Sequence, residues 1–188
     1  IDRRAELLQL VTGYRRLKAD LGLMDFGDQI ALAARLVEDQ PEVGELERAR
    51  FKVVLLDEYQ DTSVAQATML ARLFSGPDPD HGLGHPVMAV GDPNQAIYGW
   101  RGASVSNILG FGRDFPAADG SCDVATFSLT VNRRSDRRIL ELANELARPL
   151  YSRMPQVAEL EPKPDAGEGV VTSAVLETYD EELAHLAR

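Results

Sequence analysis

A short apolar run that ends abruptly in polar residues constrains the fold of this chain more than any other feature. Residues 51–56 read FKVVLL, and residues 57–62 read DEYQDT. A short, mostly continuous apolar run is typical of a parallel strand that is covered on both faces. A second such run, PVMAVGD at 86–92, also ends in an acid. The sequence therefore predicts two buried parallel strands, each followed by polar residues.

Helical patterns alternate with these strands. Helices are predicted at 2–21, 26–39, 63–74 (capped by Ser63), 103–115 (with a ragged end) and 135–151 (capped by Ser135, with a core stripe of Ile139, Leu142, Ala143 and Leu146). Further strands are predicted at 124–130 and 170–178, and a loop at 76–85. Strands that alternate with helices indicate an α/β fold with a parallel sheet. Such sheets bind ligands at the carboxyl ends of their strands, where both acidic strings fall.

Composition narrows the class of protein. The 188 residues are enough for one sizeable core, and the net charge of −10 argues mildly against a plain basic grip on nucleic acid. A single cysteine, Cys122, excludes an internal disulfide and fits a reducing compartment. No apolar stretch approaches the roughly 18 residues of a membrane span, and no signal peptide opens the chain. Because the chain begins with Ile1 inside an apparent helix, we expect it to be a piece of a longer protein.

The acidic pair after the first strand suits phosphoanhydride hydrolysis. Asp57 and Glu58 are adjacent on a predicted strand, so their side chains point in different directions. One carboxylate can hold Mg²⁺, and the other can polarise the attacking water. The alternative is that Asp57 caps the following turn and that Glu58 is only solvated. Both interpretations remain open from these two residues alone.

The second string, GDPNQAIYGWRGA at 91–103, combines an amide with two aromatic rings and a cation. The amide of Gln95 can sense a phosphate oxygen or a water. Tyr98 and Trp100 offer faces on which unpaired bases stack, and Arg101 can hold the adjoining phosphate. The alternative is that Trp100 is a core residue. Glycines on both sides of the Trp-Arg pair favour a turn, and we weigh the two interpretations equally.

The third string, NRRSDRRIL at 132–140, leads from a predicted strand end into a helix. A guanidinium here could reach a γ phosphate and stabilise the charge that develops during hydrolysis. The alternative is a solvated basic helix start, which the positive end of the helix dipole disfavours. Four arginines at this point suggest an anionic partner.

Together, these strings resemble motifs II, III and IV of the UvrD/Rep/PcrA-like superfamily 1A DNA helicases. The matching segments are LLDEYQDT, VGDPNQAIYGWRGA and LTVNRRS, in the family's order and approximate spacing. The segment LMDFGDQIALAARL at 23–36 also resembles the stretch that precedes motif II, although Gly27 replaces one of its acids. We assign that stretch a structural role.

The resemblance implies roles in binding and hydrolysing ATP with Mg²⁺. Asp57 would hold Mg²⁺, Glu58 would be the base that activates water, and Gln95 would couple the γ phosphate to DNA. Arg134 would be the motif IV arginine that faces the triphosphate. Arg133 stands where the family usually has a tyrosine that stacks on adenine, and its planar guanidinium could also stack.

The resemblance also implies partners and a domain layout. Tyr98, Trp100 and Arg101 would line the path of single-stranded DNA, at a duplex junction, in a cytoplasmic protein without a membrane part. The fold would be a RecA-like parallel sheet flanked by helices, as in P-loop NTPase motors. The predicted segments are the end of an inserted 1B-like subdomain (1–20), part of domain 1A (21–154), a linker (155–168) and the start of a 2A-like domain (169–188). The remaining motor domains of the same chain would be partners.

The main departure from the family is an absence. No G-x-x-x-x-G-K-[ST] string, the Walker A loop that cradles the phosphates, occurs in the 188 residues. We therefore expect this chain alone to bind ATP weakly and not to turn it over. Two rival interpretations stay open: an interaction module that keeps the motor fold without catalysis, and a metal-dependent nuclease, or the motor of a helicase–nuclease. The nuclease would need four carboxylates to converge: Asp57, Glu58, Asp61 and Asp92.

Overall fold

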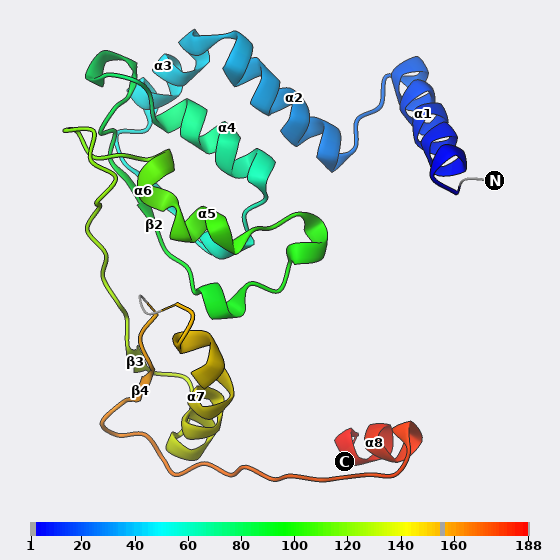
Figure 1. The fold of residues 1–188 in the computed structure, drawn as a ribbon, viewed down its shortest axis with the longest axis vertical. Helices are drawn as coiled ribbons and strands as arrows, with labels where there is room; N and C mark the ends of the chain where they lie inside the picture. The colour runs from blue at the N-terminus through cyan, green and yellow to red at the C-terminus, as the bar shows by residue number, and fades with distance from the viewer. Residues whose placement is uncertain (1–2, 155–156, 188) are drawn as a thin grey trace. The chain divides into compact units, whose positions relative to one another are not determined.

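The computed structural model describes residues 3–154 and 157–187, which form two compact units, Ile1–Ala125 and Thr126–Arg188 (Figure 1). Positions 1–2, 155–156 and 188 belong to the predicted subdomain, linker and second-motor segments, and they lie outside the described residues. Within the described ranges, no helix is both long and apolar enough to cross a membrane.

The first unit consists of helices with two short strands between them. Its elements are α1 (Arg3–Leu21), α2 (Phe26–Asp39), α3 (Pro41–Arg50), β1 (Val54–Leu56), α4 (Val64–Phe74), β2 (Val87–Ala89), α5 (Val105–Leu109) and α6 (Phe111–Asp114). The helices predicted at 26–39 and 63–74 are confirmed, as is the described part of the one predicted at 2–21. The helix α3 was not predicted, and it begins at Pro41, whose fixed φ suits a first helical position.

The two strands form a parallel pair, which makes this unit an α/β structure. Val54 pairs with Val87 and Leu56 with Ala89, and α4 lies in the crossover between the strands. The prediction that both faces are buried is wrong, because Leu55 is 71% exposed and Met88 is 55% exposed. No described element covers that face of the pair. The larger RecA-like sheet stays a prediction.

The core of the first unit lies on the other face of the strands. Four buried residues form it: Tyr59, Ala67, Phe74 and Phe115. The alternate strand residues pack against them, namely Val54, Leu56, Val87 and Ala89. The helix α4 begins with a capping box, in which the side chains of Ser63 and Gln66 accept each other's backbone N–H groups. The predicted Ser63 cap is thus confirmed.

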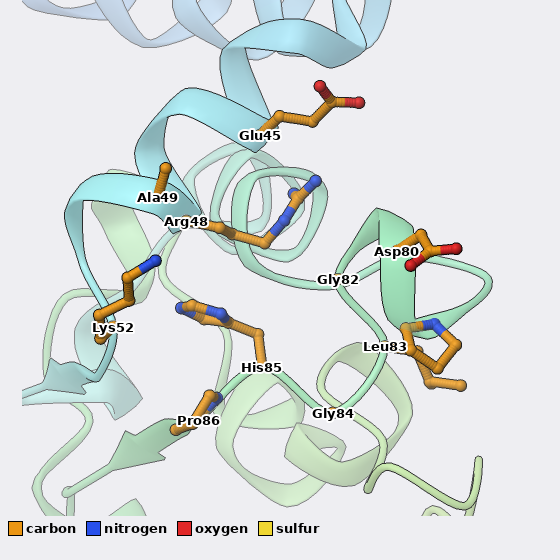
Figure 2. A pocket seen from close by; sticks show the side chains of 11 residues that line it. Glu45, Arg48, Ala49, Lys52, Asp80, Gly82, Leu83, Gly84, His85 and Pro86 are labelled. Atoms are coloured by element: carbon orange, nitrogen blue, oxygen red, sulfur yellow. The ribbon is translucent and has the colours of Figure 1, made fainter.

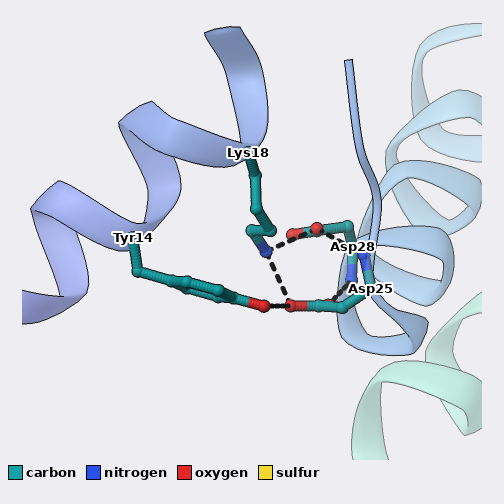
Figure 3. A network of polar contacts seen from close by, with 4 residues as sticks. All are labelled: Tyr14, Lys18, Asp25 and Asp28. Carbon is teal, nitrogen blue, oxygen red and sulfur yellow. Dashed lines mark hydrogen bonds and ion pairs between the residues drawn. The ribbon is translucent and has the colours of Figure 1, made fainter. Parts of the chain in front are cut away.

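A polar joint connects α1 to the first turn of α2 (Figure 3). Asp25 and Asp28 accept each other's backbone N–H at 2.9 Å, which is a capping box. The ammonium of Lys18 lies 2.7 Å from Asp25 and 2.5 Å from Asp28, and the Tyr14 hydroxyl donates to Asp25 at 3.0 Å. The hydrogen bond from Lys18 is the main cause that lowers the pKa of both carboxyls. Asp25 and Asp28 thus cap α2 in this structure, and the structural role of the stretch as a whole stays a prediction.

The second unit contains β3 (Val131–Asn132), α7 (Arg137–Tyr151), β4 (Glu161–Pro162) and α8 (Tyr179–Leu186). The strands predicted at 124–130 and 170–178 are wrong: neither range contains a strand, and β3 starts after the first one. A strand needs a neighbour for its backbone hydrogen bonds. The apolar side chains of these ranges stand in solvent instead, with Phe127 at 88% and Val175 at 97% exposure.

The helix α7 is confirmed, but two details of its prediction are wrong. Asp136, not Ser135, is its N-cap residue. Leu140 is the one residue of α7 that is buried, whereas the predicted core stripe is open, with Leu146 at 72% exposure. The predicted linker packs back on this helix: Asn144 donates to the Leu160 carbonyl at 2.7 Å, and β4 pairs in parallel with β3.

Candidate functional site

The polar strings that follow β1 and β2 leave the sheet at the same edge, because parallel strands share their carboxyl end. The Val90 N–H donates to the Leu56 carbonyl at 2.8 Å, and the Tyr59 N–H donates to the Val90 carbonyl at 3.0 Å. These bonds keep the two segments together beyond the last strand pair. The first two strings, far apart in sequence, therefore lie side by side.

The acidic pair lies in a strained turn rather than on a strand. The strand ends at Leu56, and Glu58 adopts the left-handed conformation with φ 49° and ψ 39°. It is the one residue other than glycine with positive φ among the described positions. This conformation costs about 1–2 kcal/mol, and such strain gathers at functional sites. Asp57 Oδ1 accepts the Glu58 N–H at 3.0 Å, and both side chains are exposed.

A buried amide anchors the Glu58 carboxylate. Gln60, which is 1% exposed, donates from Nε2 to Glu58 Oε2 at 2.7 Å. Its Oε1 accepts the backbone N–H of Asp92 at 3.2 Å. Glu58 is thus not only solvated, as the alternative interpretation held. Nothing in the sequence alone assigns a role to Gln60, although it lies within the acidic string.

Asp92 extends this connection to Gln95. One carboxylate oxygen of Asp92 accepts the Asn94 N–H at 2.9 Å, and the other accepts the Gln95 amide at 2.9 Å. A continuous series of hydrogen bonds therefore runs from Glu58 through Gln60 and Asp92 to Gln95. The structure brings together three of the predicted site residues of the first unit, counting Asp57 beside Glu58.

Tyr98, Trp100 and Arg101 form a separate cluster, which we call the aromatic patch. The two ring centroids lie 6.4 Å apart, and the Arg101 guanidinium lies 5.1 Å from the Tyr98 ring and 4.6 Å from the Trp100 ring. Trp100 is 75% exposed, so the alternative that it is a core residue is wrong. Exposed aromatic faces beside a cation are the elements that stack bases and hold phosphates.

The end of the aromatic-patch segment is tied back to the end of the acidic string. Ala103 forms an antiparallel bridge with Ser63. The side chain of Asn107, which is 8% exposed, donates to the Thr62 carbonyl at 2.7 Å. Nothing in the sequence marks Asn107, because a single asparagine in a helical stretch gives no signal of a partner 45 residues away.

Arg133 and Arg134 lie in the second unit, in the turn between β3 and α7, and both are exposed. Asn132 Oδ1 accepts the N–H groups of Arg134 and Ser135, at 3.0 and 2.8 Å, and so shapes the backbone of this turn. Their approach to the acidic strings of the first unit stays a prediction.

Some polar atoms in and beside the two strings are buried without a hydrogen-bond partner in the described part of the chain. The Tyr59 hydroxyl has no hydrogen-bond partner among the described residues, and burial, followed by the charge of Asp114, raises its pKa to about 12. Burial also raises the pKa of Asp114. One carboxylate oxygen of Asp61 and the amide oxygen of Asn94 are likewise buried without a described partner. These groups leave polar capacity unused close to the two strings.

The carboxylates do not gather as a ready-made metal cage. Among the described residues, no three His, Cys, Asp or Glu side chains group as ligands for one ion. The convergence that a nuclease would need is therefore not seen in this part of the chain. Mg²⁺ that travels with a phosphate substrate needs only one or two protein carboxylates and keeps several waters. The exposed carboxylate of Asp57 fits that lesser demand.

A shallow depression of about 520 Å³ lies near the opposite, amino-terminal edge of the strands (Figure 2). Lys52 and Pro86, which precede the strands, contribute to it together with Arg48 and His85. Arg48 is engaged structurally, because its guanidinium donates to the Leu73 carbonyl at 2.6 Å. His85 stacks on Phe74 with centroids 5.7 Å apart, and burial lowers its pKa. The depression is thus remote from the predicted site residues.

Comparison with known proteins identifies relatives of this chain. Residues 2–116 match the model of the UvrD/REP helicase N-terminal domain. The chain is 38% identical over 145 residues to an ATP-dependent DNA helicase PcrA of Staphylococcus aureus, and 37% identical over 147 residues to that of Staphylococcus epidermidis. Each match covers 77% of this chain but 18% of the relative, so the chain spans less than a fifth of these relatives' length.

Proposed function

Because the chain belongs to the UvrD/REP helicase family, we propose that it is part of an ATP-dependent DNA helicase that couples Mg-ATP hydrolysis to movement on single-stranded DNA and to duplex unwinding. The observation that carries the proposal is the hydrogen-bonded series from Glu58 to Gln95. It joins a candidate catalytic base to a candidate phosphate sensor at the carboxyl edge of a parallel pair, where α/β proteins bind ligands.

In this proposal the first unit carries the metal ligand, the base and the phosphate sensor, and the second unit carries two arginines that contact the nucleotide. Asp57 would hold Mg²⁺, which when bound would supply positive charge that offsets the negative charge of the phosphates. Glu58 accepts a proton from the attacking water. Gln95 contacts the γ phosphate and couples its presence to the residues that bind DNA. Arg134 donates to the triphosphate and stabilises the charge of hydrolysis, while Arg133 stacks on the adenine.

The aromatic patch is the proposed contact with DNA. Trp100 stacks on an unpaired base, Tyr98 supports it, and Arg101 holds the neighbouring phosphate. The exposure of Trp100 and the short segment between Gln95 and the patch support this role. A change at the γ phosphate would need to pass along only a few residues to reach a base.

The proposed partners are the other motor domains, single-stranded DNA and duplex junctions, in the cytoplasm. We assign 1–20 to a 1B-like subdomain, 21–154 to a RecA-like domain 1A, 155–168 to a linker and 169–188 to a 2A-like domain. The chain covers 18% of its relatives, which supports the need for further domains. We expect the isolated 188 residues not to hydrolyse ATP, since they contain no Walker A string.

The test is Glu58→Gln in the complete protein that contains this chain. The amide keeps the shape of the side chain but cannot accept a proton, so ATP binding should persist while DNA-stimulated turnover falls by about 10²-fold or more. Glu141→Gln, a change at an exposed acid of α7, is the matched control and should leave turnover unchanged. Full turnover by the Glu58 variant would refute the assigned base.

The missing Walker A string favours one second candidate, an interaction module that keeps the motor fold without catalysis. Reading the coding sequence upstream separates the two candidates. A G-x-x-x-x-G-K-[ST] string about one subdomain ahead of residue 1 supports the motor, and its absence from the whole gene supports the module.

A further inference from the structure

We propose that Gln60 is a positioning residue, which sets the direction of the Glu58 carboxylate and couples it to the Asp92–Gln95 turn. This inference rests on the proposed function, in which Glu58 is the catalytic base. Gln60 itself is 1% exposed and lies behind the site rather than in it. Its role would therefore be exerted through Glu58, not on the substrate.

The two ends of the Gln60 amide have different and fixed partners. The Glu58 carboxylate only accepts hydrogen bonds, so the group 2.7 Å away must be the amide nitrogen. The Asp92 backbone N–H only donates, so the group 3.2 Å away must be the amide oxygen. The network thus permits a single orientation of this amide. A buried amide with both ends engaged is a rigid connection between its two partners.

Glu58 needs such a connection because little else holds its side chain. The carboxylate is exposed, and its backbone is in a left-handed turn that no strand pairing stabilises. Among the described residues, Gln60 is the hydrogen-bond donor to its carboxylate. Without that donor, an exposed glutamate samples several rotamers, and only some of them would direct the carboxylate to the attacking water.

The close approach of Gly91 leaves little free space around the Gln60 amide. A Cβ atom on Gly91 would lie 2.4 Å from the Gln60 amide oxygen and 2.8 Å from Ile108 Cδ1. Both distances are shorter than real contacts permit, so residue 91 must lack a side chain for the amide to remain in place. Gly91 is also the residue next to Asp92. The second string therefore packs directly against the Gln60 amide.

The direct test is Gln60→Glu in the complete protein. The introduced carboxyl has the same shape and still accepts the Asp92 N–H, but once it is ionised it no longer donates to Glu58 and repels it. We expect kcat for ATP to fall about 10- to 100-fold, as for other residues that orient a catalytic group. The KM for ATP should not change, because Gln60 does not touch the nucleotide.

The pH profile separates positioning from a general structural role. As pH falls, the introduced carboxyl gains a proton and can again donate to Glu58. The ratio of variant kcat to wild-type kcat should therefore rise toward lower pH. Gln60→Met, which is similar in size but cannot donate at any pH, should lose kcat to a similar extent without that recovery.

Controls and outcomes complete the design. Gln66→Glu keeps its cap of the Ser63 N–H and should leave kcat and its pH profile unchanged. Wild-type kcat in Gln60→Met, or an equal loss in both Gln60 variants at every pH, overturns the inference. If Gln60→Glu does not fold, Gln60→Met decides alone: lower kcat at constant KM supports the inference, and wild-type kcat overturns it. Failure of the proposed function is seen separately, as turnover in Glu58→Gln.

Discussion

The acidic strand ends of the first unit and the arginine turn of the second unit hold their side chains in opposite ways. Glu58, Gln60, Asp92 and Gln95 are bonded to one another through their side chains or to each other's backbone. At Arg134, by contrast, only the backbone is ordered by a side chain, that of Asn132, and the guanidinium is exposed.

The difference matches what each kind of group would have to do in the proposed function. A base must present one oxygen to one water, so its orientation has to be fixed before the reaction. A guanidinium with five donors tolerates many approaches to a phosphate and gains its partner only when the nucleotide arrives. We therefore expect changes in the acidic network to act on geometry, and changes in the arginine turn to act on charge.

The largest expected effect concerns that charge. Arg134→Ala in the complete protein should lower kcat for ATP by about 10³-fold, because stabilisation of the transferring phosphoryl group is lost. Steady-state ATPase assays with saturating single-stranded DNA measure it. Arg153→Ala, at an exposed arginine after α7, is the control and should have no effect. Unchanged turnover in Arg134→Ala would break the comparison, since the arginine turn would then have no part in hydrolysis.

The next effect tests whether the aromatic patch is the DNA side of the acidic network. Trp100→Ala should weaken single-strand binding by about 1–3 kcal/mol, the usual contribution of one stacked base. The concentration of DNA that half-stimulates the ATPase should rise accordingly. Trp100→Phe keeps a smaller aromatic face, so its half-stimulating DNA concentration should lie between those of the wild type and Trp100→Ala. An unchanged DNA dependence in Trp100→Ala would remove this residue from the path.

A smaller effect concerns the stability that depends on Tyr59, the core residue between Glu58 and Gln60 in the chain. The pKa of Tyr59 is raised from 10.0 to about 12, so the folded state holds the phenolic proton more tightly than the unfolded state. The free energy of unfolding is therefore unaffected by this group below pH 10 and falls by about 2 kcal/mol as the pH rises toward 12. Denaturant unfolding of this chain at several alkaline pH values measures the loss. Tyr59→Phe should abolish that part of the pH dependence, and an identical profile would contradict the assignment.

The smallest effect is expected at the joint between α1 and α2. Because the pKa values of Asp25 and Asp28 are lowered in the folded state, the two carboxylates stabilise the fold above the ordinary carboxyl pKa, and this stabilisation is lost as the pH falls. Lys18→Met should therefore lower the melting temperature slightly at neutral pH, and high salt should reduce the difference. In strong acid the two proteins should melt alike. A difference that persists there would show that Lys18 acts through packing instead.

The sequence allowed the local features of the first unit to be predicted better than its surfaces. The apolar runs, the Ser63 cap and the helix 26–39 follow from spacing and capping rules that depend on neighbouring residues only. The exposure of Leu55 could not be predicted, because it depends on what lies over the strand. The helix α3 was not predicted, since a proline directly after a helix can either follow the end of that helix or begin the next one, as Pro41 does.

In the candidate site, too, residues in local strings could be recognised from the sequence, whereas a long-range contact could not. Asp57, Glu58 and Gln95 are recognisable from strings that combine chemistry with a strand end. The role inferred for Gln60 is not, because it depends on a backbone N–H 32 residues away. Long-range partners of single amides leave no periodic or compositional trace in one sequence, so only coordinates reveal them.

The close approach at Gly91 has a consequence for how this chain tolerates random change. A codon change there to any larger amino acid would press on the buried amide and on Ile108 at once, so neither neighbour could yield alone. Met88, only three positions earlier, is open to solvent and has no such restriction in this structure. A saturation library over 86–92, scored by the yield of folded protein, should therefore show that position 91 tolerates fewer residues than position 88.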